Sequence, residues 1–113
     1  MSPTVKAERL QVETQSRRGR VRIRVHGRLE AEGTSSLRKA IDGALESKPD
    51  SIHLDLSDLE FFGSAGIQII CELVAHCLDR GVTVTLSMKP EATRILELVG
   101  LGWVANITVP ASA

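Results

Sequence analysis

The sequence predicts an α/β protein in which one mixed β-sheet of about five strands packs with about three main helices. Two observations carry this prediction. Strand-like apolar segments are separated by segments whose apolar residues recur at helical spacing, and strands joined through helices form parallel crossovers. The first two strand-like segments are separated only by residues 15–19, so we expect an antiparallel hairpin there.

The N-terminal hairpin is expected to pair residues 10–14 with residues 20–26. In the second of these strands, three aliphatic residues alternate with Arg20, Arg22 and Arg24. Successive side chains of a strand point to opposite faces. The aliphatic residues are therefore expected in the core and the arginines in solvent.

Three helices are expected, each with apolar residues at the i, i+3, i+4 and i+7 spacing of one buried face. The first follows residues 27–30, and the second runs from about residue 64 to residue 80 and ends at Gly81. The third begins near Pro90 and stops at Gly100. The later strands are expected at residues 51–56, 82–86 and 106–109.

The same spacing predicts which helical residues are buried. In the first helix they are Leu37, Ala40, Ile41, Ala44 and Leu45. In the second they are Ile67, Ile70, Cys71, Val74 and Leu78. In the third they are Ala92, Ile95, Leu96 and Val99, with Leu101 folding back on Leu96.

Length and composition indicate one ordinary globular domain over residues 1–113, with its core at about 8–109 and a flexible tail at 110–113. We expect no signal peptide and no membrane span. Cys71 and Cys77 lie six residues apart on one expected helix and therefore point apart, which favours a reduced, cytoplasmic protein. Cys71 is expected inside and Cys77 nearer the accessible edge of the apolar stripe.

Charge is unevenly distributed although the net charge is zero. Residues 1–28 hold eight basic and two acidic residues, a charge of +6, and the remainder carries −6. This asymmetry either steers a charged partner or reflects complementary surfaces within one fold. With one Trp, two Phe and no Tyr, there is little aromatic surface for stacking bases, so we expect no nucleic-acid binding.

The turn at Gly63-Ser64-Ala65-Gly66 is the strongest candidate site. It follows a buried-type strand and immediately precedes the second helix, so Ser64 lies at the positive end of that helix. This position suits a helix N-cap, anion binding, or a phosphate carried by the serine itself.

Other residue patterns do not indicate an enzyme. Gly-x-Ser-x-Gly would need a glycine at Phe62, and no histidine has an interpretable spacing to Ser64. Glu72 and His76 lie four residues apart on one helix, but two ligands make a poor metal site. Asp55, Asp58 and Glu60 gather at the end of a strand, where such residues more often cap a turn. We therefore expect neither a cofactor nor a metal.

An ordered series of motifs resembles the STAS domain family. It comprises the hairpin, Gly-x-Leu-acid at 27–30, Leu-Asp-Leu-Ser at 54–57, x-Ser-x-Gly at 63–66, Gly-Val-x-Val at 81–84, and Pro-x-x-x-x-Ile-Leu-x-x-x-Gly-Leu at 90–101. Among STAS proteins the chain is similar to the stand-alone anti-sigma factor antagonists of bacteria. The resemblance covers about residues 8–109.

The resemblance implies a protein-binding regulator of transcription that works by partner switching. Such an antagonist binds an anti-sigma factor, often a serine kinase of the histidine-kinase-like ATPase fold, and so releases a sigma factor. In phospho-regulated members the turn reads Asp-Ser-Ser-Gly and the second serine accepts the phosphate. Here that position is Ala65, and Gly63 replaces the acidic residue.

Three interpretations of this departure stay open. Ser64 takes the place of the missing acceptor; or the protein binds its partner without serine-phosphate control; or it is a STAS subunit of a lipid-transport ATPase or sensory complex. The expected contact surface is residues 62–67 and the outward face of the helix that follows. Its residues are Phe62, Gly63, Ser64, Ala65, Gly66, Ile67, Gln68, Glu72, Ala75 and His76, with Glu30 and Asp58 on the rim.

Overall fold

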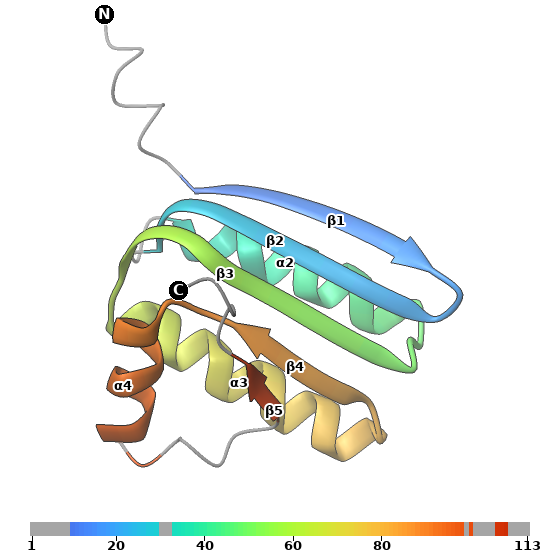
Figure 1. Ribbon diagram of the computed structural model, residues 1–113. Helices are drawn as coiled ribbons and strands as arrows, with labels where there is room; N and C mark the ends of the chain where they lie inside the picture. The colour runs from blue at the N-terminus through green and yellow to red at the C-terminus, as the bar shows by residue number, and fades with distance from the viewer. Residues whose placement is uncertain (1–9, 30–32, 99, 101–105, 109–113) are drawn as a thin grey trace, which may run out of the picture.

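The computed structural model describes residues 10–29, 33–98, 100 and 106–108, and this part of the chain forms one five-stranded sheet in the order β1-β2-β3-β4-β5 (Figure 1). β1 is antiparallel to β2, and all other pairs are parallel. The strands are β1 (Gln11–Arg17), β2 (Arg20–Leu29), β3 (Ser51–Phe62), β4 (Thr83–Ser87) and β5 (Asn106–Thr108). The helices are α2 (Thr34–Glu46), α3 (Ser64–Arg80) and α4 (Pro90–Leu98). The predicted fold class is confirmed.

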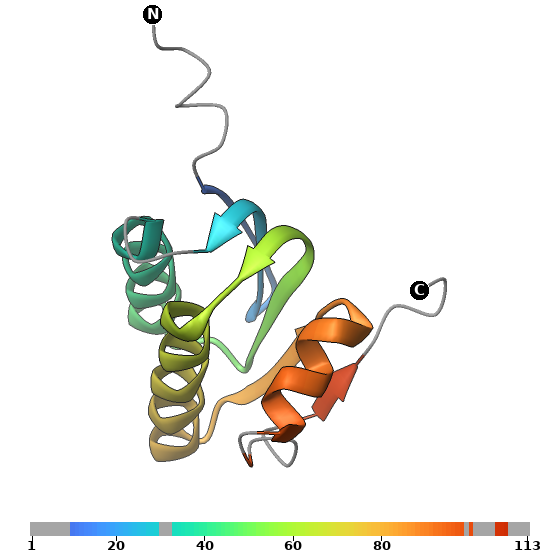
Figure 2. The same ribbon diagram turned by 90° about the vertical axis from the view of Figure 1, so that its left-hand side faces the viewer.

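Helices α2 and α3 lie side by side on one face of the sheet, where α2 contacts β1 and β2 and α3 contacts β3 and β4 (Figure 2). Helix α4 lies at the end of the sheet where β3 and β4 finish (Figure 1). The core fills the space between the sheet and the helices. Its strand residues include Val21, Ile23, Val25, Ile52, Leu54, Leu56, Val84 and Leu86.

The first helix packs as its sequence predicts. Leu37, Ile41, Ala44 and Leu45 are buried, and Ala40 is half-buried against the core. Each lies on the face that the spacing selects, because this helix has only one apolar stripe.

The second helix has the predicted bounds, but its buried face is only partly the predicted one: Ile70 and Val74 are buried and Ile67 is half-buried, as expected, whereas the predictions for Cys71 and Leu78 are wrong. The buried aliphatic side chains are Ile69, Ile70, Leu73 and Val74, together with Cys77, whereas Cys71 and Leu78 are exposed, Leu78 by 68%. At 100° per residue the buried arc is rotated by roughly a quarter turn from the predicted one. The reason is α2: α3 packs against both the sheet and α2, so its buried arc shifts toward that neighbour.

Several strand boundaries also differ from prediction: β1 and β2 extend to Arg17 and Leu29, beyond the expected residues 14 and 26, and β4 is displaced by one residue. β3 continues to Phe62 instead of ending at residue 56, because its parallel pairing with β2 resumes beyond register shifts between Arg24 and His26 and between Gly27 and Arg28. Such irregularities let a strand pass through polar residues without ending. The hairpin turn is shorter than expected and consists of Arg18 and Gly19, with φ of 52° and 80°.

The helix ends follow the glycine signals. Gly81 is left-handed at φ 72° and Gly100 at φ 83°, as a glycine that terminates a helix requires. In the third helix Leu96 is buried and Ala92 and Ile95 are half-buried. Val99, Leu101 and the tail at 110–113 lie outside the described residues.

Replacing Arg18 with Asn should stabilise the protein. Both turn residues have positive φ, as in the type I′ turns that favour Asn-Gly, and a left-handed conformation costs most side chains about 1–2 kcal/mol. We expect Arg18→Asn to raise the free energy of unfolding by about 0.5–1 kcal/mol in urea denaturation. Arg18→Gln removes the same charge without the conformational benefit. Equal stability of the two variants would contradict the argument.

Candidate functional site

The β3–α3 turn places Ser64 at the first position of α3. Gly63 is the N-cap, in an extended conformation with φ −111° and ψ −166°, and no side chain caps the helix. The backbone N–H groups of Gly66 and Ile67 both donate to the Gly63 carbonyl oxygen, at 3.0 and 3.2 Å. Of the three roles considered for Ser64, that of helix N-cap is therefore excluded, since the N-cap residue is Gly63.

The side chains of this turn differ in exposure. Ser64 is exposed, Ala65 and Ile67 are half-buried, and Gly66 is buried. No interaction of the Ser64 hydroxyl is found within the described part of the chain, and the first turn of α3 has no acidic residue. A free hydroxyl therefore stands at a helix end whose positive potential is not offset by a neighbouring carboxylate.

The other predicted contact residues are only partly brought together. On α3, Gln68 is exposed and donates to Glu72 at 3.5 Å, and Glu72 forms an ion pair with Arg38 of α2. Ala75 and His76 are exposed farther along the helix. Asp58 lies instead on the face of the sheet opposite the helices, bound to Arg24 and His26. Glu30 and the side chain of Phe62 lie outside the described residues.

A polar cluster that the sequence did not reveal lies on the sheet face opposite α2 and α3. Asp55 on β3 is only 8% exposed, and it accepts hydrogen bonds from Ser57 Oγ at 2.6 Å, from Ser57 N at 3.0 Å and from Arg22 at 3.2 Å. Arg24 lies between Asp55 at 3.8 Å and Asp58 at 3.3 Å. The parallel register brings them together, since Arg22 is opposite His53 and Arg24 is opposite Asp55.

Two groups in this cluster have shifted pKa values. Burial alone would raise the pKa of Asp55, but the hydrogen bonds from Ser57 and the charge and hydrogen bond of Arg22 outweigh it and hold that pKa below its usual value. Burial lowers the pKa of His53. The charge of nearby Asp55 raises this pKa in part, and the charge of Arg22 lowers it further. His53 also contacts the hydroxyls of Thr85 and Ser87, at 2.6 and 2.9 Å. Because the Asp55 carboxylate already accepts hydrogen bonds from Ser57 and Arg22, a structural role is favoured for this residue.

Residues 12–106 match a family model described as "Mlab, STAS domain". The chain belongs to the STAS domain family. No curated protein sequence matches it significantly.

Solved structures share the fold. An anti-sigma factor antagonist from Mycobacterium paratuberculosis is 22% identical with a TM-score of 0.79, over 90% of this chain and 86% of that one. The anti-sigma factor antagonist SpoIIAA in its unphosphorylated form is 20% identical with a TM-score of 0.73, over 90% and 88% of the two chains. The Bacillus cell fate determinant SpoIIAA in its phosphorylated form is 20% identical with a TM-score of 0.70, over 90% and 91%. At these identities the likeness establishes a common fold.

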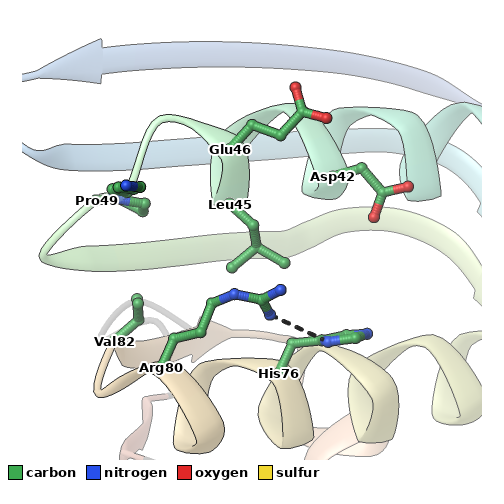
Figure 3. A pocket seen from close by; sticks show the side chains of 8 residues that line it. Asp42, Leu45, Glu46, Pro49, His76, Arg80 and Val82 are labelled. Carbon is green, nitrogen blue, oxygen red and sulfur yellow. Dashed lines mark hydrogen bonds between the residues drawn. The ribbon is translucent and has the colours of Figure 1, made fainter.

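A groove runs between α2 and α3 of this STAS domain, with a volume of about 710 Å³ (Figure 3). Arg80 reaches from α3 toward α2 and lies 3.2 Å from Nδ1 of His76. Asp42, Leu45 and Glu46 line the opposite side. Glu72 and His76, the pair considered as metal ligands, therefore contact different arginines. Among the described helices, none is long and apolar enough to cross a membrane.

The two cysteines have the opposite exposure to that predicted. Cys71 is exposed on the outward side of α3, whereas Cys77 is fully buried. Burial raises the pKa of the Cys77 thiol, and nearby Arg80 only partly offsets this. A thiol with a raised pKa and no access to solvent reacts slowly, because the thiolate is the nucleophile.

We expect a thiol reagent to modify one cysteine in the native protein. Cys71 should react within the time of mixing, and Cys77 only after denaturant is added, as measured by mass spectrometry of the intact protein. Cys71→Ser should abolish the fast reaction and Cys77→Ser should leave it unchanged. Fast modification of Cys77 in native buffer would contradict the placement of α3.

Asp55 should contribute more stability than Asp58. Asp55→Asn weakens charge-assisted hydrogen bonds in a buried place, and we expect a loss of about 1–3 kcal/mol at pH 7. Asp58 has a side chain 52% exposed, so Asp58→Asn should cost less than about 1 kcal/mol. Urea denaturation of both variants gives the comparison.

The contribution of Asp55 to the free energy of unfolding should also depend on pH. Because folding lowers the pKa of Asp55, its stabilisation is fully present above the unfolded value near pH ~4 and is lost as the pH falls through the folded value. The difference between wild type and Asp55→Asn should therefore shrink below about pH 4. A difference that stays constant down to about pH 2 would contradict this assignment.

Proposed function

We propose that this STAS domain is a cytoplasmic binding protein of the anti-sigma factor antagonist type, which binds an anti-sigma factor and so releases a sigma factor. The observation that carries the proposal is the exposed Ser64 hydroxyl at the start of α3, on a turn that no side chain caps. The matched family and the antagonists among the similar folds support it.

The proposed contact surface is centred on this turn. It comprises residues 62–67 and continues along α3 through Gln68, Glu72, Ala75 and His76. Asp58, expected on its rim, lies on the other face of the sheet and is left out of the proposed surface. Ser64, Gln68 and Ala75 are exposed at i, i+4 and i+11, so they share one side of the helix. This exposed side of a single helix is suited to a folded partner, and the proposed partner is an ATPase of the histidine-kinase-like fold.

A phosphate on Ser64 would regulate binding without unfolding the domain. It adds a charge of about −1.5 to −2, which the N-terminus of α3 tolerates because no carboxylate occupies its first turn. The same charge at a partner interface causes repulsion and loss of solvation. Ala65, at the family's usual acceptor position, has no hydroxyl and is half-buried, so Ser64 is the residue of this turn that a kinase could modify.

A second candidate function is kept because the matching family model is described as "Mlab, STAS domain" and not as an anti-sigma factor antagonist. In that case the domain is a subunit of a lipid-transport ATPase or a sensory complex. The same turn and the outward face of α3 would then hold a constitutive partner, with no role for phosphate on Ser64.

Replacing Ser64 with Glu should weaken partner binding at least tenfold, or about 1.4 kcal/mol, because a charge enters the centre of the contact surface. The measurement is a pull-down from native cytosol with wild type and Ser64→Glu, with partners and phosphorylation identified by mass spectrometry, followed by titration of the recovered partner. Thr83→Glu places the same charge on an exposed position at the other end of the sheet and should bind as wild type does.

The partner recovered separates the candidates. A histidine-kinase-like ATPase together with phosphate on Ser64 supports a partner-switching antagonist whose acceptor has moved by one residue. The same partner without phosphate supports an antagonist controlled otherwise. If only transport or sensory subunits are recovered, the sigma-factor assignment is wrong and the second candidate function takes its place. If Ser64→Glu binds the partner with unchanged affinity, the interface lies elsewhere.

A further inference from the structure

Strand β1 has an open edge. It pairs only with β2 in the described sheet, and six of its seven residues are exposed (Figure 1). Arg17 and Arg20 flank the two-residue turn, so they exchange their backbone hydrogen bonds. Because this pattern alternates along the strand, Val12, Thr14 and Ser16 direct their backbone N–H and C=O groups away from β2. These groups form a ready template for another strand.

β1 lacks the features that usually block such an edge. Its sequence contains no proline and no lysine, and its pairing with β2 runs from Gln11 to Arg17 without a register shift. The strand therefore presents a regular edge. Only its polar composition, with Glu13 and Arg17 as its charged residues, limits what can pair with it.

Glu13 and Arg17 lack charge partners within the described residues, although both are exposed. Arg17 lies opposite Arg20, and a like-charged pair across two strands is unfavourable. Glu13 lies opposite Arg24, but the Arg24 guanidinium is turned toward Asp55 and Asp58 on the other side of β2. Each of the two charges on β1 is thus left without the counter-charge that a second strand could supply.

We infer that β1 pairs antiparallel with β1 of a second copy of this chain, about a two-fold axis that passes through Gln15. In a symmetric antiparallel pair, the polar face of one copy continues the polar face of the other only if the two-fold axis passes through a residue. If the axis passed between two residues, each polar-face residue would lie opposite a core-face residue. With the axis at Gln15, Glu13 of each copy lies opposite Arg17 of the other. Thr14 and Ser16, whose backbone groups point outward, then exchange hydrogen bonds.

The surroundings of β1 permit this arrangement. Arg38 and Asp42 mark the side of α2 that faces α3, so Ser36, Ala40 and Gly43 lie on the opposite side, toward the β1 edge. These residues are small, and there is open space around Gly43. Two α2 helices can therefore approach across the axis. β2 and β3 separate β1 from α3, which leaves the Ser64 turn accessible, so the inference does not depend on the proposed function.

Sedimentation velocity between about 1 µM and 1 mM tests the pairing in solution. We expect a dimer whose fraction rises with concentration. Glu13→Arg and Arg17→Glu should each raise the dissociation constant about tenfold or more, because both symmetric contacts become like-charged. The double variant Glu13→Arg/Arg17→Glu should restore it. Arg94→Glu, an exposed charge reversal on α4, should have no effect.

Thr14→Pro provides a second test. Its N–H group points to the open edge, so proline there removes an intermolecular donor while the β1–β2 ladder keeps its own bonds. We expect a folded monomer, with the fold checked by circular dichroism. A monomer at all concentrations would overturn the inference, as would a dimer that is indifferent to Thr14→Pro. If the wild type dimerises but the double variant does not restore its dissociation constant, the register centred on Gln15 is wrong.

Discussion

The helices α2 and α3 cover only one face of the sheet, and this one-sided covering governs the rest of the structure. Each central strand must present aliphatic residues to the helices and polar residues to solvent. In β2 the second set is a row of arginines, which would repel one another if left alone. β3 supplies Asp55 and Asp58 at the positions where the parallel register brings them to Arg22 and Arg24. The cluster around Asp55 is thus a consequence of leaving that face uncovered.

The same pairing positions the candidate site. β3 remains bound to β2 as far as Phe62, so the chain enters the turn from a strand that is held at its end. Gly63 then begins α3 directly, and the buried side of α3 fixes which residues face outward. A charge added at Ser64 therefore falls on an exposed position and not in the core. This is the property that a switch protein needs if its modified form must remain folded.

How well the sequence predicts each part depends on how many interpretations its pattern allows. α2 has one apolar stripe, so its buried residues could be predicted. α3 has apolar residues around most of its circumference. Cys71 and Leu78 continue one apolar stripe as regularly as Leu73 and Cys77 continue another. Contact with α2 determines that the stripe of Leu73 and Cys77 is the buried one. Ser57 and Asp58 resemble a turn in sequence, although β3 continues through them: Ser57 lies in a register shift, and Asp58 pairs again with His26. An arginine in a left-handed turn conformation gives no sequence signal at all.

The charge asymmetry of the sequence divides into two parts in the folded protein. Arg22 and Arg24 are neutralised by acidic residues of β3, as expected for complementary surfaces of one fold. Arg17, Arg18 and Arg20 have no such partner in the described part of the chain, and they gather at the hairpin turn. Because β2 and β3 are parallel, this turn lies at the opposite end of the sheet from Ser64. Beyond a Debye length of about 8 Å, negative charge at Ser64 is screened from these arginines. The two ends can therefore engage different partners independently.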